Sequence, residues 1–108
     1  MNTSLVREKI EEYAKVIVKK FDPEKVILFG SYARGTPGPN SDADLLVVAQ
    51  TTNTRRLAQD IDASLWGRTL PLDILVYTPE TVAGRLSIGD FFMRDIIEKG
   101  RTLYEKRY

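Results

Sequence analysis

The sequence contains no cysteine and no histidine. Without cysteine the chain has neither disulfide bonds nor thiolate metal ligands. Without histidine it has no Ser-His catalytic triad, no His-ligated zinc and no imidazole to carry protons near neutral pH. Any acid-base chemistry must therefore use carboxylates, lysine, tyrosine or metal-bound groups.

Strong charge and long apolar runs are absent as well. The formal net charge is +1, and lysine and arginine are spread along the chain, so no electrostatic footprint for duplex nucleic acid is visible. The N-terminus has no apolar signal region, and no apolar run approaches the length of a membrane span. We therefore expect a cytoplasmic protein without membrane contact. The 108 residues have room for a single domain, 1–108, with one modest core.

Hydrophobic periodicity predicts short strands alternating with helices, which is typical of the α/β class. Apolar residues spaced by three and four mark the helices, and continuous apolar runs that end at glycine or proline mark the strands. In the first half of the chain we expect a helix over 4–21, a strand over 25–29, a short helix from 31 to 34 and a strand over 42–49. A helix capped within 51–54 and stopped at Gly67 should follow, and then a strand over 70–77. The last elements expected are a helix from 78 to about 85, a helix opened by Ser87 and stopped at Gly100, and a strand over 102–105.

A glycine turn follows the first predicted strand. Gly30 and Ser31 come directly after the apolar run 25–29, and they precede the short helix expected at 31–34. Glycine allows close approach of a ligand to the backbone, and amide groups at such a turn can face an anion. The next segment, 35–40, is dense in turn-forming residues and is predicted to be a loop. The turn is thus of a size and kind that suits a phosphate group.

Two aspartates open the second predicted strand. Asp42 and Asp44 are two positions apart, so alternation along a strand places both on one face. Their Cα atoms would be roughly 6.5–7 Å apart for a rise of about 3.3 Å per residue. Two carboxylates at this spacing can share a pair of divalent ions about 3.5–4 Å apart. Because Leu46 and Val48 share the same face, the acids must lie at the open beginning of the strand.

A third aspartate, Asp73, interrupts the apolar strand 70–77. A single charge in such a strand is costly to bury unless a positive group lies near it. It is either a water-exposed residue at the end of the strand or a third carboxylate facing a metal. The pair at Asp42 and Asp44 favours the second interpretation, because both would need such a companion.

Three aromatic residues raise a question of packing. Phe91 and Phe92 are adjacent, so they cannot both point directly at one core. They either wrap around the core, or one of them serves a partner surface. Trp66 is predicted to pack at the end of its helix.

Taken together, these motifs resemble the minimal nucleotidyltransferases of the DNA polymerase β superfamily. The resemblance spans nearly the whole chain, and it implies a small mixed β-sheet of three or four strands flanked by helices, a fold similar to the polymerase β palm. The positions that fit the family signature are Gly30, Ser31, Gly35, Ser41, Asp42, Asp44 and Asp73.

The resemblance also implies the chemistry. Asp42, Asp44 and Asp73 would hold Mg²⁺, with two ions expected, and ATP would be the substrate. Asp73 would complete the acceptor side and could take the acceptor proton. Gly30 and Ser31 would bind the phosphates, together with Ser41. Arg34 either contacts the triphosphate or is simply solvated.

Free-standing members of this family are antitoxins paired with a helical HEPN-domain toxin, an RNase. Their activity is transfer of AMP from ATP to a tyrosine of the toxin, which blocks it. The resemblance therefore implies a separate protein as acceptor and an assembly with that toxin. Other hypotheses are an antitoxin that acts by binding alone, nucleotidyl transfer to a small molecule or RNA end at a site completed by homodimerisation, and a small α/β binding domain without catalysis.

Overall fold

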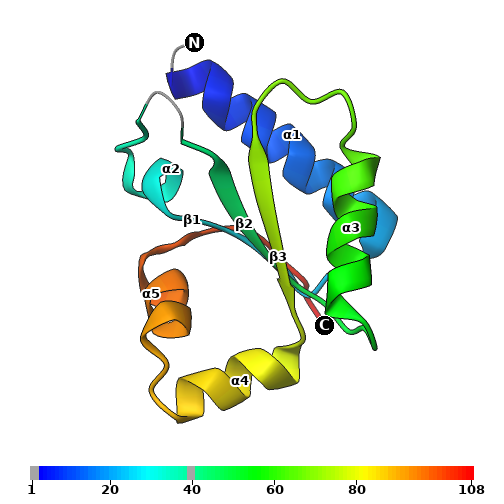
Figure 1. Cartoon of the computed structure of the whole chain (residues 1–108), viewed down its shortest axis with the longest axis vertical. Coiled ribbons are helices and arrows are strands. Elements are labelled where there is room, and N and C mark those ends of the chain that lie inside the picture. Colours follow the sequence, from blue (N-terminus) through cyan, green and yellow to red (C-terminus); the bar gives the residue numbers. More distant parts are fainter. Residues whose placement is uncertain (1–2, 39–40) are drawn as a thin grey trace.

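The computed structural model describes residues 3–38 and 41–108, so the predicted loop at 35–40 lies partly outside the described residues (Figure 1). Helices and strands alternate along the chain except where α5 directly follows α4, as expected from the sequence. They are α1 (Thr3–Phe21), β1 (Lys25–Phe29), α2 (Ser31–Arg34), β2 (Ala43–Val48), α3 (Thr54–Ser64), β3 (Leu72–Tyr77), α4 (Pro79–Ser87), α5 (Phe91–Lys99) and β4 (Arg101–Glu105). None of the helices described is both long and apolar enough to cross a membrane.

The strands form one mixed sheet in the order β3-β2-β1-β4. β1 is antiparallel to both β2 and β4, whereas β2 and β3 are parallel. A parallel pair needs a crossover connection, and α3 supplies it here. The small mixed sheet of three or four strands that the family resemblance implies is therefore confirmed, with four strands.

One face of the sheet packs against α1 and α3; in Figure 1, α3 lies to the right of the strands and α1 runs diagonally from the upper left toward it. Ile10, Ala14 and Ile17 come from α1, and Ile61 comes from α3. They bury the alternate residues of the strands, namely Val26, Leu28, Ala43, Leu45, Val47, Leu72 and Val76. β1 and β2 are the two inner strands, and Ala43, Leu45 and Val47 of β2 are fully buried in this cluster.

Among the residues that the structure describes, α4 and α5 cover the opposite face of the sheet. Met93 and Ile96 of α5 are buried against Ile27, Leu46 and Val48 of the sheet, and Val82 of α4 packs at the margin. By strand alternation, Asp44 and Asp73 project from this same face. The acids therefore share a face with the second apolar cluster, as the spacing of Asp44, Leu46 and Val48 predicts.

The corner between α4 and α5 differs from the expectation. We expected Ser87 to open the last helix, but Ser87 is the final residue of α4, and Asp90 is the N-cap of α5, accepting a bond from Met93 N at 3.1 Å. Gly89 has φ of 76° and follows the end of α4, where its N–H donates to Leu86 O at 3.1 Å. The N–H of Asp90 donates to Arg85 O at 3.0 Å, so the two bonds form a Schellman motif.

Trp66 also departs from its predicted role. Its side chain is 90% exposed, so it does not pack at the end of α3. The helix ends at Ser64, and Gly67 then takes a φ of 87°. The indole therefore follows the helix into the connecting turn, where no core element covers it.

Two glycines should respond in opposite directions to alanine. A Cβ at Gly100 would overlap Ile96 O and crowd Leu28 O, both of which belong to the backbone and cannot rotate away. We expect Gly100→Ala to lower the free energy of unfolding by about 1–3 kcal/mol. Gly84 lies inside α4 with open space around its Cα. Gly84→Ala should raise stability by about 0.8–1 kcal/mol, since alanine is the better helix former.

Urea denaturation of the two variants and the wild type measures both effects. A Gly100→Ala variant as stable as the wild type would contradict the close packing of Gly100 against Ile96 and Leu28.

Candidate active site

Asp44 lies at the centre of the candidate site. In the sheet it is paired with Phe29 of β1 on one side and with Asp73 of β3 on the other. Neighbouring strands are about 4.8 Å apart, and paired residues project from the same face, so Asp44 and Asp73 are direct neighbours. Asp44 is half-buried and Asp73 is exposed. The structure thus brings together two acids that are 29 positions apart in the sequence.

The glycine turn lies directly against Asp44. Gly30 has φ of 77° and ψ of −155°, a conformation that side-chain-bearing residues rarely adopt. A Cβ built at Gly30 would overlap Oδ2 of Asp44. Glycine is therefore required at this position for two reasons: the backbone conformation and the close approach of the Asp44 carboxylate. The predicted tight turn at Gly30 and Ser31 is confirmed.

The charges around Asp44 act on one another. Partial burial raises the pKa of the Asp44 carboxyl, and the negative charges of Asp73 and Asp42 raise it further, while Arg34 acts in the opposite direction. Within the described part of the chain, these three aspartates form no hydrogen bond or ion pair. The three carboxylates therefore repel one another, and none of them is paired with a positive side chain among the described residues.

Asp42 lies just before β2 and not within it, in contrast to the predicted strand 42–49. The ladder between β2 and β3 begins where Ala43 N donates to Pro71 O at 3.0 Å. Pro71 has no N–H with which to continue the ladder, so the pairing stops there. Asp42 is consequently exposed and free of the strand geometry that holds Asp44.

Three further positions of the family signature or candidate site lie in or at the end of the short helix that follows the turn. Ser31 begins α2, and Gly35 ends it with a left-handed φ of 76°. Arg34 is exposed in the last position of this helix. Ser41 makes a local contact, because its hydroxyl accepts the N–H of Gly38 at 2.8 Å.

The donor set suits Mg²⁺, which prefers carboxylate and water oxygens. Two carboxylates held side by side, with a third close enough to shift the pKa of Asp44, are the oxygens such an ion requires. No group of three or more acidic side chains among residues 3–38 and 41–108 is already gathered as a metal-binding cluster. Asp44 and Asp73 are thus paired within the sheet, and Asp42, just before β2, is the candidate for a third ligand.

The site has an aromatic border that we did not predict. The rings of Phe29 and Phe92 meet edge to face with centroids 5.9 Å apart. Since Phe29 is the strand partner of Asp44, this contact places α5 beside the acids. The sequence carries a partial signal, because Phe29 immediately precedes Gly30, but only the fold reveals its contact with Phe92.

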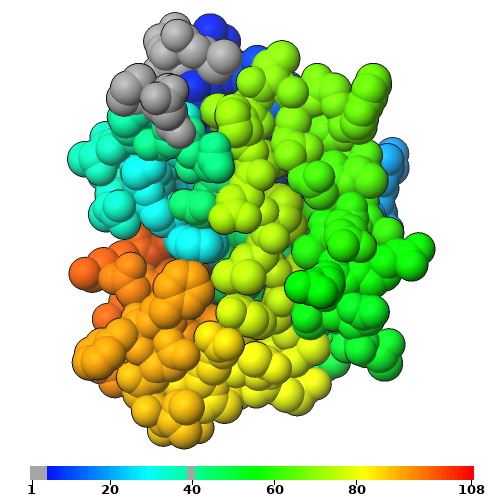
Figure 2. Space-filling model, in the orientation of Figure 1, coloured from blue at the N-terminus to red at the C-terminus, as the bar shows by residue number. Residues whose placement is uncertain are grey.

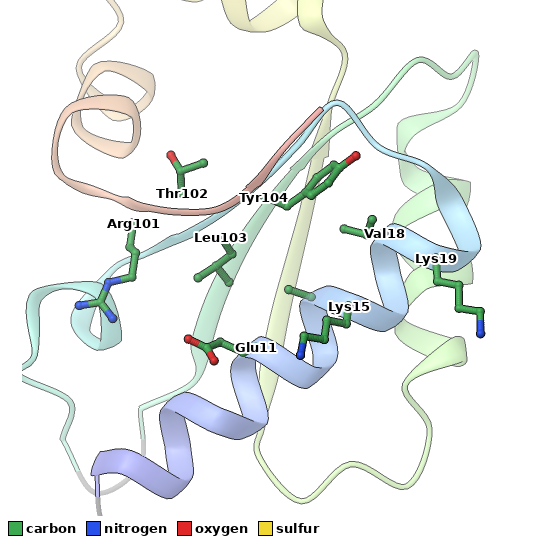
Figure 3. Close-up of a pocket in the computed structure, with 9 residues that line it drawn as sticks. Glu11, Lys15, Val18, Lys19, Arg101, Thr102, Leu103 and Tyr104 are labelled. Carbon is green, nitrogen blue, oxygen red and sulfur yellow. The ribbon is translucent and has the colours of Figure 1, made fainter. Parts of the chain in front are cut away.

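A cavity of about 420 Å³ lies elsewhere, between α1 and β4 (Figure 3). Lys15 and Val18 of α1 and Arg101 and Leu103 of β4 are among its lining residues. Leu103 packs with the cluster on the α1 face of the sheet, opposite to the face that carries Asp44. The sheet therefore separates this cavity from the acids.

The chain matches the model of the nucleotidyltransferase domain family over residues 9–104. It is 39% identical over 59 residues to MJ1305, a proposed protein adenylyltransferase of Methanocaldococcus jannaschii, in a match that covers 53% of this chain and 40% of that protein. A second proposed protein adenylyltransferase of the same organism, MJ0141, is 33% identical over 72 residues, covering 67% of this chain and 71% of that protein. The match thus spans less than half the length of the first relative.

Solved structures confirm the fold. A proposed nucleotidyltransferase from Sulfolobus solfataricus superposes with a TM-score of 0.64 at 19% identity, covering 98% of this chain and 90% of that one. A toxin-antitoxin structure with AMP-PNP gives 0.60 at 22% identity, covering 90% and 74%. A mutant of the MntA-HpeT toxin-antitoxin complex gives 0.56 at 20% identity, covering 99% and 76%.

Replacing Asp44 by Asn should stabilise the protein when no divalent cation is present. The change removes the Asp44 carboxylate, whose pKa is raised by its partial burial and by repulsion from Asp73 and Asp42. Like charges opposite each other in a sheet are destabilising by about 0.2–1 kcal/mol, so we expect a gain of that size in the free energy of unfolding near neutral pH. Because folding raises this pKa, wild-type stability falls as the pH rises through it, and the gain should disappear at about pH 4 and below.

Urea titration in EDTA measures the gain. Asp60→Asn is the matched control, because Asp60 pairs with Arg56 at 3.1 Å and its loss should leave stability equal or slightly lower. A variant Asp44→Asn less stable than the wild type would contradict the repulsion described above.

Proposed function

Since the chain belongs to the nucleotidyltransferase domain family, whose model matches residues 9–104, we propose that it transfers a nucleotide from ATP to a hydroxyl group. The observation that carries the proposal is the pairing of Asp44 with Asp73, directly beside the turn at Gly30. Nucleotidyl transfer depends on aligning an acceptor oxygen with a triphosphate and on neutralising charge, and both tasks suit adjacent carboxylates at a phosphate-sized turn.

The residues would divide the work as follows. The acceptor oxygen attacks the α-phosphorus of ATP, a P–O bond to the acceptor forms, and the bond to the leaving oxygen breaks to release pyrophosphate. Asp73, the more exposed of the pair, would receive the hydroxyl proton. Gly30 and Ser31 would hold phosphate oxygens, with Arg34 and Ser41 at the rim. Two Mg²⁺ ions held by Asp42, Asp44 and Asp73 would neutralise the triphosphate and polarise the acceptor.

The acceptor in this proposal is a tyrosine of a HEPN-domain toxin, and the group transferred is AMP. Two relatives bear the name of proposed protein adenylyltransferases, which supports a protein as acceptor. Two solved structures with the same fold are toxin-antitoxin complexes, and one of them contains AMP-PNP, which supports a toxin partner and an adenine nucleotide. The toxin-bound assembly and the dependence on Mg²⁺ belong to the same proposal.

Nucleotide binding should depend on both Mg²⁺ and the acids. Calorimetry with ATP and Mg²⁺ should give a measurable affinity for the wild type and at least about a tenfold weaker one for Asp42→Asn, since a charge-assisted contact contributes about 1.5–3 kcal/mol. The control Asp62→Asn removes an acid that pairs with Arg68 at 2.7 Å and should bind ATP normally. Equal affinity in all three proteins would favour a binding domain without this catalytic site.

Transfer itself can be followed by mass spectrometry. Incubation with the purified product of the adjacent gene, ATP and Mg²⁺ should add whole AMP units to that protein, and peptide mapping should place them on tyrosine. Asp42→Asn/Asp44→Asn should reduce the rate by several orders of magnitude, because charge neutralisation at the triphosphate is lost.

Two results would contradict this proposal. No added mass with the wild type would reject transfer to that protein. Protection of cells from the toxin by Asp42→Asn/Asp44→Asn, as strong as that by the wild type, would favour an antitoxin that acts by binding alone.

A further inference from the structure

The corner between α4 and α5 exposes several large apolar side chains. We define the α4-α5 corner as Leu86, Ile88, Phe91 and Phe92. Ile88 is 82% exposed, Phe91 81% and Phe92 47%. Single exposed apolar residues are common on protein surfaces, but neighbouring ones that include aromatic rings are typical of binding sites.

The corner is held rigidly. The Schellman bonds at Gly89 and Asp90 fix the end of α4, and Asp90 caps α5. The guanidinium of Arg85 pairs with the carboxylate of Asp90 at 3.4 Å and also stacks over the ring of Tyr77 at 4.5 Å from its centre. Ile88 and Phe91 are therefore presented on a preorganised turn, which lowers the entropy lost when a partner binds.

The corner is continuous with the candidate active site. Phe92 contacts Phe29, and Phe29 is the strand partner of Asp44. Tyr77, which Arg85 covers, projects from the same sheet face as Asp73. Figure 2 shows the surfaces of α2 (cyan), β3 (yellow-green) and α5 (orange) meeting on one face of the molecule. Phe92 therefore joins the corner to the surface beside Asp44.

Charge defines what the corner can bind. From Thr81 to Phe92 the only charged residues are Arg85 and Asp90, and they pair with each other. The exposed residues of this segment are all uncharged. Beyond the segment, Arg94 and Asp95 of α5 are exposed and opposite in charge. The complementary surface is therefore mainly apolar with little net charge, which fits a protein face better than a nucleic acid or an acidic membrane surface.

We infer that the α4-α5 corner is the docking surface for the protein that carries the acceptor hydroxyl. The inference rests on the proposed function and names the surface through which the partner of that site is held. A second copy of this chain is the weaker occupant, because a dimer formed through the corner would stand beside Asp44, where the acceptor must lie. Ile88 and Phe91 act as anchors, and Phe92 links them to the site.

The test compares apolar-to-acidic substitutions inside and outside the corner. Ile88→Asp and Phe91→Asp alter highly exposed side chains, so both variants should fold, as thermal unfolding would verify. Trp66→Asp is the matched control, because Trp66 is 90% exposed and follows α3, away from the corner. The probe is the product of the adjacent gene, with binding measured by calorimetry and AMP transfer measured over a range of its concentration at saturating ATP.

Both corner variants should raise the Kd and the KM for the acceptor protein at least about tenfold, as truncation of an interface anchor does. Their kcat at saturating acceptor and their affinity for ATP should stay within about twofold of the wild type. Trp66→Asp should match the wild type. Corner variants that bind and react like the wild type would overturn the inference, and so would a wild-type dimer that Phe91→Asp dissociates.

The docking surface and the transfer reaction fail in different ways. Asp42→Asn/Asp44→Asn should transfer nothing and still bind the acceptor with wild-type affinity. If the wild type binds the acceptor protein through the corner but transfers no nucleotide, the docking surface is supported and the proposed reaction is rejected. If transfer occurs and the corner variants bind and react like the wild type, the proposed reaction is supported and the docking surface is rejected.

Discussion

The close approach of the Asp44 carboxylate to the backbone of Gly30 is the constraint around which the rest of this structure is arranged. It requires that the residue directly after β1 have no side chain, in a conformation with φ of 77° that favours glycine. It also requires that β2 run antiparallel to β1 in the register that sets Phe29 opposite Asp44. Once that register is set, the parallel pairing of β3 brings Asp73 to the same place. One contact thus couples the turn, the sheet order and the acid pair.

The same face of the sheet serves both packing and chemistry. Leu46 and Val48 are buried under Met93 and Ile96, whereas Asp44, on the same strand and face, is only half-buried. The difference arises because α4 and α5 cover one end of this face and leave the other open. A carboxylate is costly to bury fully, so the strand can carry acids only beyond the reach of the covering helices. Coverage of half the face is therefore a condition for having a site there.

Much of this arrangement can be predicted from the sequence, because it depends on local patterns. The strand before Gly30, the turn at Ser31 and the common face of Asp44, Leu46 and Val48 all follow from alternation and glycine placement. The pairing of Asp44 with Asp73 does not, because it depends on how α3 returns the chain to the sheet. The start of β2 after Asp42 depends on the missing N–H of Pro71 across the ladder. The Schellman bonds at Gly89 and the exposure of Trp66 likewise depend on contacts, or their absence, between segments.

Uncompensated charge and exposed apolar surface meet at one border of the molecule, and both are unfavourable in an isolated chain. The aspartates repel one another without an ion pair among the described residues, and the α4-α5 corner leaves Ile88 and Phe91 in water. Folding alone explains neither, since Asn at the acids and polar residues at the corner would fit the same backbone. Each is relieved by a different ligand, cations and phosphate at the acids and a protein surface at the corner. Because Phe29 touches both regions, the two ligands would be neighbours, which is the geometry that transfer from a nucleotide to a protein requires.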